Sequence, residues 1–260
     1  MLPFWLDVLE PTLRLLEPRL VVEIGSESGK CTHRILELTA DWGGRVEAID
    51  PAPLFDVDAW LDRWGERFVL HQAPSLEVIG SLEAPDAVMI DGDHNWYTVF
   101  HELSEIEERM GELGAAMPLI FLHDISWPYG RRDLYYAPEM IPADQRQPFA
   151  RKGISPTSSE LLEEGGFNRH LCNADHEGGP RNGVLTAVED YLDKSAHRFR
   201  FVRIPAAFGL GILLPEALAV KRPALAEAID VWKAPMVERF IDRLETARIA
   251  MLTGLAAVPR

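Results

Sequence analysis

The sequence predicts an α/β protein built on a doubly wound, mostly parallel sheet. Short apolar runs alternate with stretches of helical spacing over residues 20–122, which is the rhythm of βαβ units. The runs are apolar throughout, as expected of strands that helices cover on both faces. Each run ends in a polar or glycine residue. Because ligands of such sheets bind beyond the carboxyl ends of the strands, these terminal residues are the candidates for function.

Five strands are predicted, at residues 19–24, 45–49, 67–71, 86–90 and 118–122. After them the rhythm stops, and the segment 127–182 is rich in Pro, Gly, Arg, Tyr and Trp, so we predict an irregular insertion there. Two strand-like runs, 199–204 and 208–214, then predict a hairpin at the sheet edge, after a helix over 184–192. Helices are predicted in 216–260, where the apolar stripe fits either core packing or a dimer seam.

Composition narrows the function classes. With 260 residues and 47% apolar content, the chain 1–260 is long enough for one large domain with a sizeable core. Acidic residues outnumber basic ones by 41 to 26, and the net charge of -15 disfavours nucleic acid and anionic membranes as partners. The two cysteines, Cys31 and Cys172, favour a reducing compartment. No basic leader and no membrane-spanning run is visible, so we expect a cytoplasmic protein.

The glycine-bearing stretch VVEIGSESGKCTHRIL, residues 21–36, follows the first predicted strand. It does not fit a phosphate loop, because the glycine spacing is one residue short and Cys31 replaces the required hydroxyl. It does not fit a dinucleotide loop either, since the second and third glycines are absent. What remains is an acid, Glu23, followed by Gly25 and Gly29, which suits a cationic ligand. The second strand ends in Asp50, about 20 residues beyond Gly29, where an acid can accept ribose hydroxyls.

Ionisable side chains crowd the ends of the fourth and fifth strands. DAVMIDGDHNW delivers Asp91, Asp93 and His94 in one turn, and FLHDISWP adds His123 and Asp124. One aspartate can cap the following helix, and we expect Asp93 to do so. Capping leaves the others unexplained, and carboxylates at adjacent strand ends could share a divalent cation.

These motifs resemble those of the class I S-adenosylmethionine-dependent methyltransferases, which have a Rossmann-like sheet. The resemblance implies that S-adenosylmethionine is the cofactor and that the loop after the first strand wraps its methionine part. The acid at the end of that strand would hold its amino group, the acid ending the second strand its ribose, and the turn after the third strand its adenine. The implied cofactor-binding residues are Glu23, Gly25, Ser26, Gly29, Asp50, Ser75 and Asp91.

The stretch I-D-G-D-H also resembles the I-D-G-[DS]-H motif of small-molecule O-methyltransferases that act on sugars and natural products. That resemblance implies Asp91 and Asp124 as ligands of Mg²⁺ or another divalent cation, and His94 as general base. His123 is the rival base. Ile125 departs from the pattern, since it stands where the catechol-type enzymes have a third ligand, asparagine, so the need for a metal stays open.

The insertion is predicted to be a lid over the substrate, because its aromatic and arginine side chains suit a polar ring-containing acceptor. The predicted acceptor contacts are Trp127, Tyr129, Arg131, Arg132, Tyr135, Tyr136 and Asn182. The sequence therefore predicts O-methylation of a small polar acceptor such as a sugar or glycosylated metabolite, by a chain that could form a homodimer. The alternatives are N-methylation of a small amine and a catalytically silent module for cofactor binding or assembly.

Overall fold

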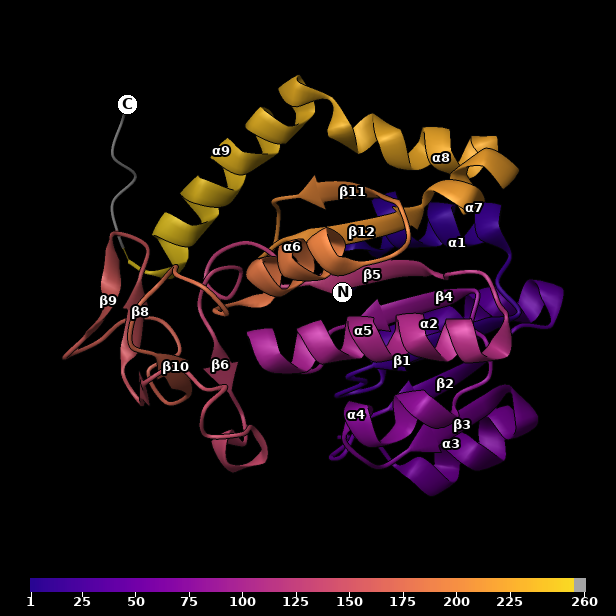
Figure 1. The fold of residues 1–260 in the computed structure, drawn as a ribbon, viewed down its shortest axis with the longest axis horizontal. Coiled ribbons are helices and arrows are strands. Elements are labelled where there is room, and N and C mark those ends of the chain that lie inside the picture. Colours follow the sequence, from indigo (N-terminus) through magenta and orange to yellow (C-terminus); the bar gives the residue numbers. More distant parts are fainter. Residues whose placement is uncertain (255–260) are drawn as a thin grey trace.

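The computed structural model describes residues 1–254 and contains the predicted doubly wound sheet (Figure 1). Seven strands lie in the order β11-β12-β5-β4-β1-β2-β3. Their bounds are β1 (Leu20–Ile24), β2 (Arg45–Ile49), β3 (Phe68–His71), β4 (Ala87–Ile90), β5 (Leu119–His123), β11 (Phe199–Ile204) and β12 (Leu210–Pro215). The strands β1 to β5 pair in parallel, whereas β12 is antiparallel to both β5 and β11. The expected hairpin thus forms one edge of the sheet.

Helices cover both faces of the sheet, because alternate residues of each buried strand point to opposite sides. Val21 and Met89 belong to one core cluster, and Val22 and Val88 belong to the other. The helices of the first face are α1 (Glu10–Leu16), α2 (Lys30–Thr39), α3 (Val57–Trp64), α7 (Glu216–Lys221) and α8 (Pro223–Asp230). Those of the second face are α4 (Ser75–Val78), α5 (Trp96–Leu113) and α6 (Val184–Lys194).

The insertion is more regular than the sequence predicts. It forms a three-stranded sheet in the order β6-β10-β7 and a hairpin of β8 with β9. The bounds are β6 (Leu134–Tyr135), β7 (Phe149–Ala150), β8 (Gly153–Ser155), β9 (Ser158–Leu162) and β10 (Cys172–Ala174). Strands of two to five residues are too short to show an apolar period, which explains why the sequence pattern does not reveal them.

The C-terminal helices divide between core and solvent. In α8, Leu225 and Ile229 are buried in the core, as core packing predicts. The last helix, α9 (Pro235–Leu252), extends toward the insertion (Figure 1), and its Phe240 and Leu244 are 55% and 56% exposed. The prediction of helices over 216–260 also covers residues 255–260, which lie outside the described residues. Across residues 1–254, none of the helices has both the length and the apolar character needed to cross a membrane.

Candidate active site

The loop that follows β1 lies directly against the turn that follows β4. A Cβ atom on Gly25, whose φ is +87°, would lie 2.4 Å from the carbonyl oxygen of Asp91. Only glycine fits at this contact, because the approaching group is backbone and cannot move aside. The Gly25 amide also donates to the Ile49 carbonyl at 2.9 Å, which ties the loop to the end of β2. The ends of β1, β2 and β4 therefore meet at one point of the sheet edge.

Two carboxylates and two imidazoles form a compact cluster after β4 and β5. His123 Nδ1 lies 2.7 Å from Asp124 Oδ2 and 3.2 Å from Asp91 Oδ1. His94 Nε2 lies 2.9 Å from Asp124 Oδ2 and 3.8 Å from Asp91 Oδ1. All four residues were singled out from the sequence, and parallel strands bring them together because their carboxyl ends share one edge.

The cluster perturbs the pKa of each member. Burial disfavours charge on the imidazoles, but the facing carboxylates outweigh it, raising the pKa of His94 and bringing that of His123 to about 9. Although burial opposes charge on the carboxyls too, the imidazoles hold the pKa values of Asp91 and Asp124 below their usual range. His94 must therefore lose a proton before it can accept one, and we expect its base form to grow as the pH rises.

The N-terminal residues close the cluster on one side. The Met1 amino group lies 2.6 Å from Asp91 Oδ2, while Oδ1 of the same carboxylate faces His123. The Phe4 ring meets the His123 ring edge-on, with 5.9 Å between centroids. Nothing in the sequence pattern predicts these contacts, which join residues about 90 positions or more apart. Asp91 thus presents one oxygen to an ammonium group and the other to the imidazoles.

Glu23 and Asp50, the other two acids predicted to hold the cofactor, lie beside this cluster, and each has a protein partner. Glu23 is 1% exposed and accepts a hydrogen bond from the Thr32 hydroxyl, and burial raises its pKa to about 7. Asp50 Oδ2 accepts from the Glu27 amide at 2.7 Å and from the Ser26 hydroxyl at 3.1 Å. Asp50 therefore joins the loops that follow β1 and β2.

Gly29 and Ser75 both contact other parts of the protein. A Cβ atom on Gly29, whose φ is +71°, would lie 2.7 Å from the Trp60 ring, so a side chain packs closely on this glycine. Ser75 donates to Glu102 of α5 at 2.5 Å, and sequence reasoning missed this acid. A signal was present, because Glu102 interrupts the apolar stripe of α5 that includes Val99 and Ile106.

Five of the seven predicted acceptor contacts are turned toward protein partners: Tyr129, Arg131, Arg132, Tyr135 and Asn182. Arg132 is fully buried and donates to the carbonyl oxygens of Ala174 and Ser159. Asn182 accepts from the Asp133 amide at 2.7 Å. Buried charges and backbone groups need such partners, so this placement corrects the expectation that these side chains face a ligand.

Arg131 and Tyr135 are also turned toward protein partners. Arg131 forms an ion pair with Glu189 of α6, at 2.6 Å. The Tyr135 hydroxyl donates to Asp133 at 2.7 Å. The fully buried Asp133 also accepts from the backbone amides of Trp96 and Gly183, at 2.7 Å and 2.6 Å. These contacts fasten the insertion to α5 and α6.

Two side chains of the predicted set, Tyr136 and Tyr129, contact His94. The Tyr136 hydroxyl is 3.3 Å from His94 Nδ1, and 56% of Tyr136 is exposed. The Tyr129 ring stacks on the imidazole, with 5.7 Å between centroids. Trp127 packs near Tyr129, and within the described chain its indole nitrogen has no hydrogen-bond partner. Tyr136 is therefore the exposed neighbour of His94.

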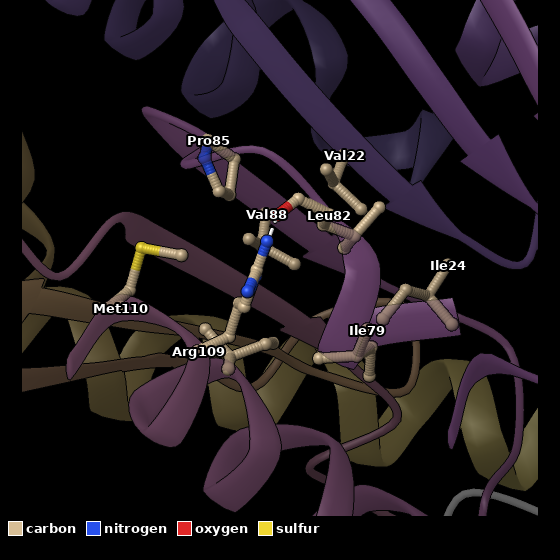
Figure 2. A pocket seen from close by; sticks show the side chains of 9 residues that line it. Val22, Ile24, Ile79, Leu82, Pro85, Val88, Arg109 and Met110 are labelled. Carbon is tan, nitrogen blue, oxygen red and sulfur yellow. Dashed lines mark hydrogen bonds between the residues drawn. The ribbon is translucent and has the colours of Figure 1, made fainter. Parts of the chain in front are cut away.

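Two cavities lie away from this cluster. Figure 2 shows an apolar void between the sheet and α5, where Arg109 donates to the Leu82 carbonyl at 2.8 Å. Its volume of about 10 Å³ is too small for a ligand and reflects imperfect packing. A groove of about 700 Å³ lies between residues 2–7 and the start of α2, with Gly29 and Trp60 in its wall. It adjoins the loop that follows β1 through Ser28 and Gly29.

Comparison with known proteins identifies a methyltransferase domain in part of the chain. Residues 22–125 match the family model described as a methyltransferase domain. No curated protein sequence matches the chain. The SAH-bound methyltransferase PaMTH1 of Podospora anserina is 15% identical, with 79% of this chain and 75% of that chain covered and a TM-score of 0.48.

Two further solved structures are similar to the chain. The SAM-bound O-methyltransferase TomG of Streptomyces achromogenes is 11% identical over 80% of this chain and 77% of its own, with a TM-score of 0.43. The 1,6-didemethyltoxoflavin-N1-methyltransferase of Burkholderia thailandensis is 14% identical over 82% and 80%, with a TM-score of 0.42. The family match shows a methyltransferase domain over residues 22–125, within the doubly wound sheet.

Proposed function

We propose that the chain transfers the methyl group of S-adenosylmethionine to a hydroxyl group of a small polar acceptor, such as a sugar or glycosylated metabolite. The observation that carries the proposal is the cluster of His94, Asp91 and Asp124 at the strand ends beside the Gly25 loop. It supplies a base next to the edge where a cofactor of this class binds. The acceptor enters beneath the insertion, residues 127–182, which forms its lid.

The cofactor would lie across the ends of β1, β2 and β4. Asp50 is the acceptor for the ribose hydroxyls, and Glu23 and Asp91 face the methionine part. The assignment is supported by the position of Glu23 and Asp91 at the ends of the neighbouring strands β1 and β4. Ser26 and Gly25 shape the loop around the methionine part.

The reaction needs alignment and one proton acceptor. The acceptor oxygen forms a bond to the methyl carbon as the bond from that carbon to sulfur breaks, and the sulfonium becomes a neutral thioether. The hydroxyl proton passes to His94 Nδ1, the nitrogen that faces Tyr136. Asp124 holds the opposite nitrogen, Nε2, at 2.9 Å and stabilises the imidazolium that forms. His123 is less suited as base, because its ring lies against Phe4.

A divalent cation fits the same cluster. Ligand atoms of Asp91, His123 and Asp124 lie within 4.8 Å of one another, and Nδ1 of His123 faces both carboxylates. A donor set that mixes carboxylate with imidazole suits Mn²⁺ or Zn²⁺ better than Mg²⁺. Such an ion would polarise the acceptor hydroxyl and make its proton easier to remove.

Metal content tests this part of the proposal. Protein purified without chelator and then dialysed against Mn²⁺ or Zn²⁺ should retain about one ion per chain by elemental analysis. The Asp124→Ala variant should retain much less, while Asp144→Ala, which alters an exposed acid in the insertion, should bind as wild type does. Equal metal content in the wild type and Asp124→Ala would exclude the site, whatever the activity.

Cofactor binding is the first test of the whole proposal. Calorimetry should show binding of S-adenosylmethionine or S-adenosylhomocysteine in the micromolar range, about 8 kcal/mol. Asp50→Ala should weaken it by about tenfold or more, because a charged acceptor for the ribose is lost. Asp58→Ala, an exposed acid in α3, is the matched control and should bind normally. Undiminished affinity in Asp50→Ala would contradict the assignment.

The lid is tested at Tyr136. Tyr136→Ala should raise the Michaelis constant of the acceptor or lower turnover, because the exposed ring beside His94 would contact the acceptor. The dissociation constant of the cofactor should not change, since Tyr136 lies on the acceptor side of the cluster. Met140→Ala, a 60% exposed residue of the same insertion, serves as control. Identical acceptor kinetics for Tyr136→Ala and wild type would remove the insertion from the acceptor site.

Two alternatives are decided by the product. An N-methyltransferase would use His94 to orient an amine and would yield a methylated nitrogen, which mass spectrometry of the product distinguishes. A silent cofactor-binding or assembly module would bind the cofactor and methylate nothing. In a homodimer, a second copy would pack on the exposed Phe240 and Leu244 of α9. The molecular mass of the protein in solution tests whether such a dimer forms.

A further inference from the structure

Glu102 is a buried acid that neither the proposed chemistry nor the packing of the fold uses. It lies in the second turn of α5 and is 1% exposed. A carboxyl group is costly to bury without partners, so a single buried acid in an apolar stripe calls for a reason. The surrounding core could accommodate an apolar side chain at that position, as it does at Val99 and Leu103.

Only one of its two oxygens is satisfied. Oε1 accepts a hydrogen bond of 2.5 Å from the Ser75 hydroxyl. Oε2 is buried and has no hydrogen-bond partner in the part of the chain that the structure describes. Burial, with the nearby negative charge of Asp93, raises the pKa of Glu102 to about 8 against the opposing effect of Ser75. The carboxyl is therefore neutral at pH 7 and offers both an O–H donor and an acceptor oxygen.

Its position is next to the place expected for the base of a nucleoside. The Asp50 amide donates to the His71 carbonyl at 3.0 Å, so the ends of β2 and β3 are neighbours. Ser75 begins the helix that follows β3. A ribose held at Asp50 carries its base directly, and the turn after β3 begins next to the end of β2. Glu102 touches this turn through Ser75 and is influenced by Asp93 in the turn after β4.

We propose that Glu102, positioned by Ser75, recognises the amino-bearing edge of the adenine of the methyl donor. That edge presents one donor, the 6-amino group, beside one acceptor, the ring nitrogen N1. A neutral carboxyl complements both, since it can accept from the amino group and donate to the ring nitrogen. The inference rests on the proposed function, because it takes the donor to be S-adenosylmethionine.

The test compares two ligands with two kinds of variant. The ligands are S-adenosylhomocysteine and its analogue in which hydrogen replaces the 6-amino group. Wild type should bind the first at least about tenfold more tightly, as one buried hydrogen bond predicts. In Glu102→Leu that ratio should fall to about one. Glu102→Gln should keep the ratio, because an amide can also donate and accept.

Controls separate this inference from its foundation. Glu108→Leu alters an exposed acid of the same helix and should keep the wild-type ratio. If Glu102→Leu does not fold, the unbranched Glu102→Met provides the apolar side chain in its place. An apolar variant that binds S-adenosylhomocysteine and discriminates against the analogue as wild type does would overturn the inference alone. A wild-type protein that binds neither ligand would overturn the proposed function and this inference with it.

Discussion

Replacing His94 by alanine should lower the turnover of methyl transfer by about 100-fold or more, the usual cost of losing a general base. The physical reason is the position of its Nδ1 atom, which lies 3.3 Å from the exposed Tyr136 hydroxyl, where an acceptor hydroxyl would sit. Cofactor affinity should change little, because the proposed ribose and methionine contacts are Asp50, Glu23 and Asp91 and do not include His94. Turnover and cofactor affinity should therefore separate in this variant.

Two further histidine variants complete the experiment. His170→Ala, an exposed residue of the insertion, should be as active as wild type. His123→Ala should lower activity less than His94→Ala, because the His123 ring is directed toward Phe4. If His94→Ala keeps full turnover while His123→Ala loses it, the roles of the two imidazoles are exchanged.

Replacing Asp133 by alanine should reduce the free energy of unfolding by about 3 kcal/mol or more, since several buried donors lose one acceptor. The donors are the amides of Trp96 and Gly183 and the Tyr135 hydroxyl. They belong to α5, to the residue before α6 and to the insertion, so the variant should loosen all three together. Denaturation in urea, followed by fluorescence, gives the change in midpoint.

Asp144→Ala is the matched control, because that aspartate lies exposed in the same insertion. It should leave the urea midpoint nearly unchanged. A midpoint for Asp133→Ala that equals the wild-type value would show that the buried contacts of the insertion do not support the rest of the domain. The insertion could then move without destabilising the domain, and the proposed acceptor site would have to function with a mobile insertion.

The fold was predictable because its signals are local and periodic. Continuous apolar runs such as 86–90 identify strands, and parallel strands place their terminal residues on one edge. That rule alone brings Asp91 and Asp124 together from strands about 30 residues apart in the chain. The order of the strands and the closing hairpin agree with the predicted doubly wound sheet.

The roles of side chains in the insertion were not predictable in the same way. Arginine and tyrosine in a loop suit ligand binding, but they equally suit the buried backbone of a loop that folds on itself. Arg132 took the second course, with both of its bonded nitrogens donating to carbonyl groups, whereas Tyr136 stayed exposed beside His94. Composition cannot separate these outcomes, because they depend on which strands of the insertion pair.

Contacts between distant segments could not be predicted from the sequence either. No pattern indicates that Phe4 reaches His123, or that Trp60 packs on Gly29. An apolar stripe predicts a helix with one apolar face but does not say what covers that face. The pattern therefore could not show that the stripe of α8 lies in the core while Phe240 in α9 is exposed.

A crystal structure of the protein with S-adenosylhomocysteine is the strongest test of the proposed methyl-transfer site. We expect the ribose at Asp50, the methionine part beside Glu23 and Asp91, and the sulfur pointing toward the space between His94 and Tyr136. The Met1 amino group should then have left Asp91. Ligand density elsewhere, with the Asp50 contacts to Ser26 and Glu27 unchanged, would contradict the assignment of this edge as the methyl-transfer site.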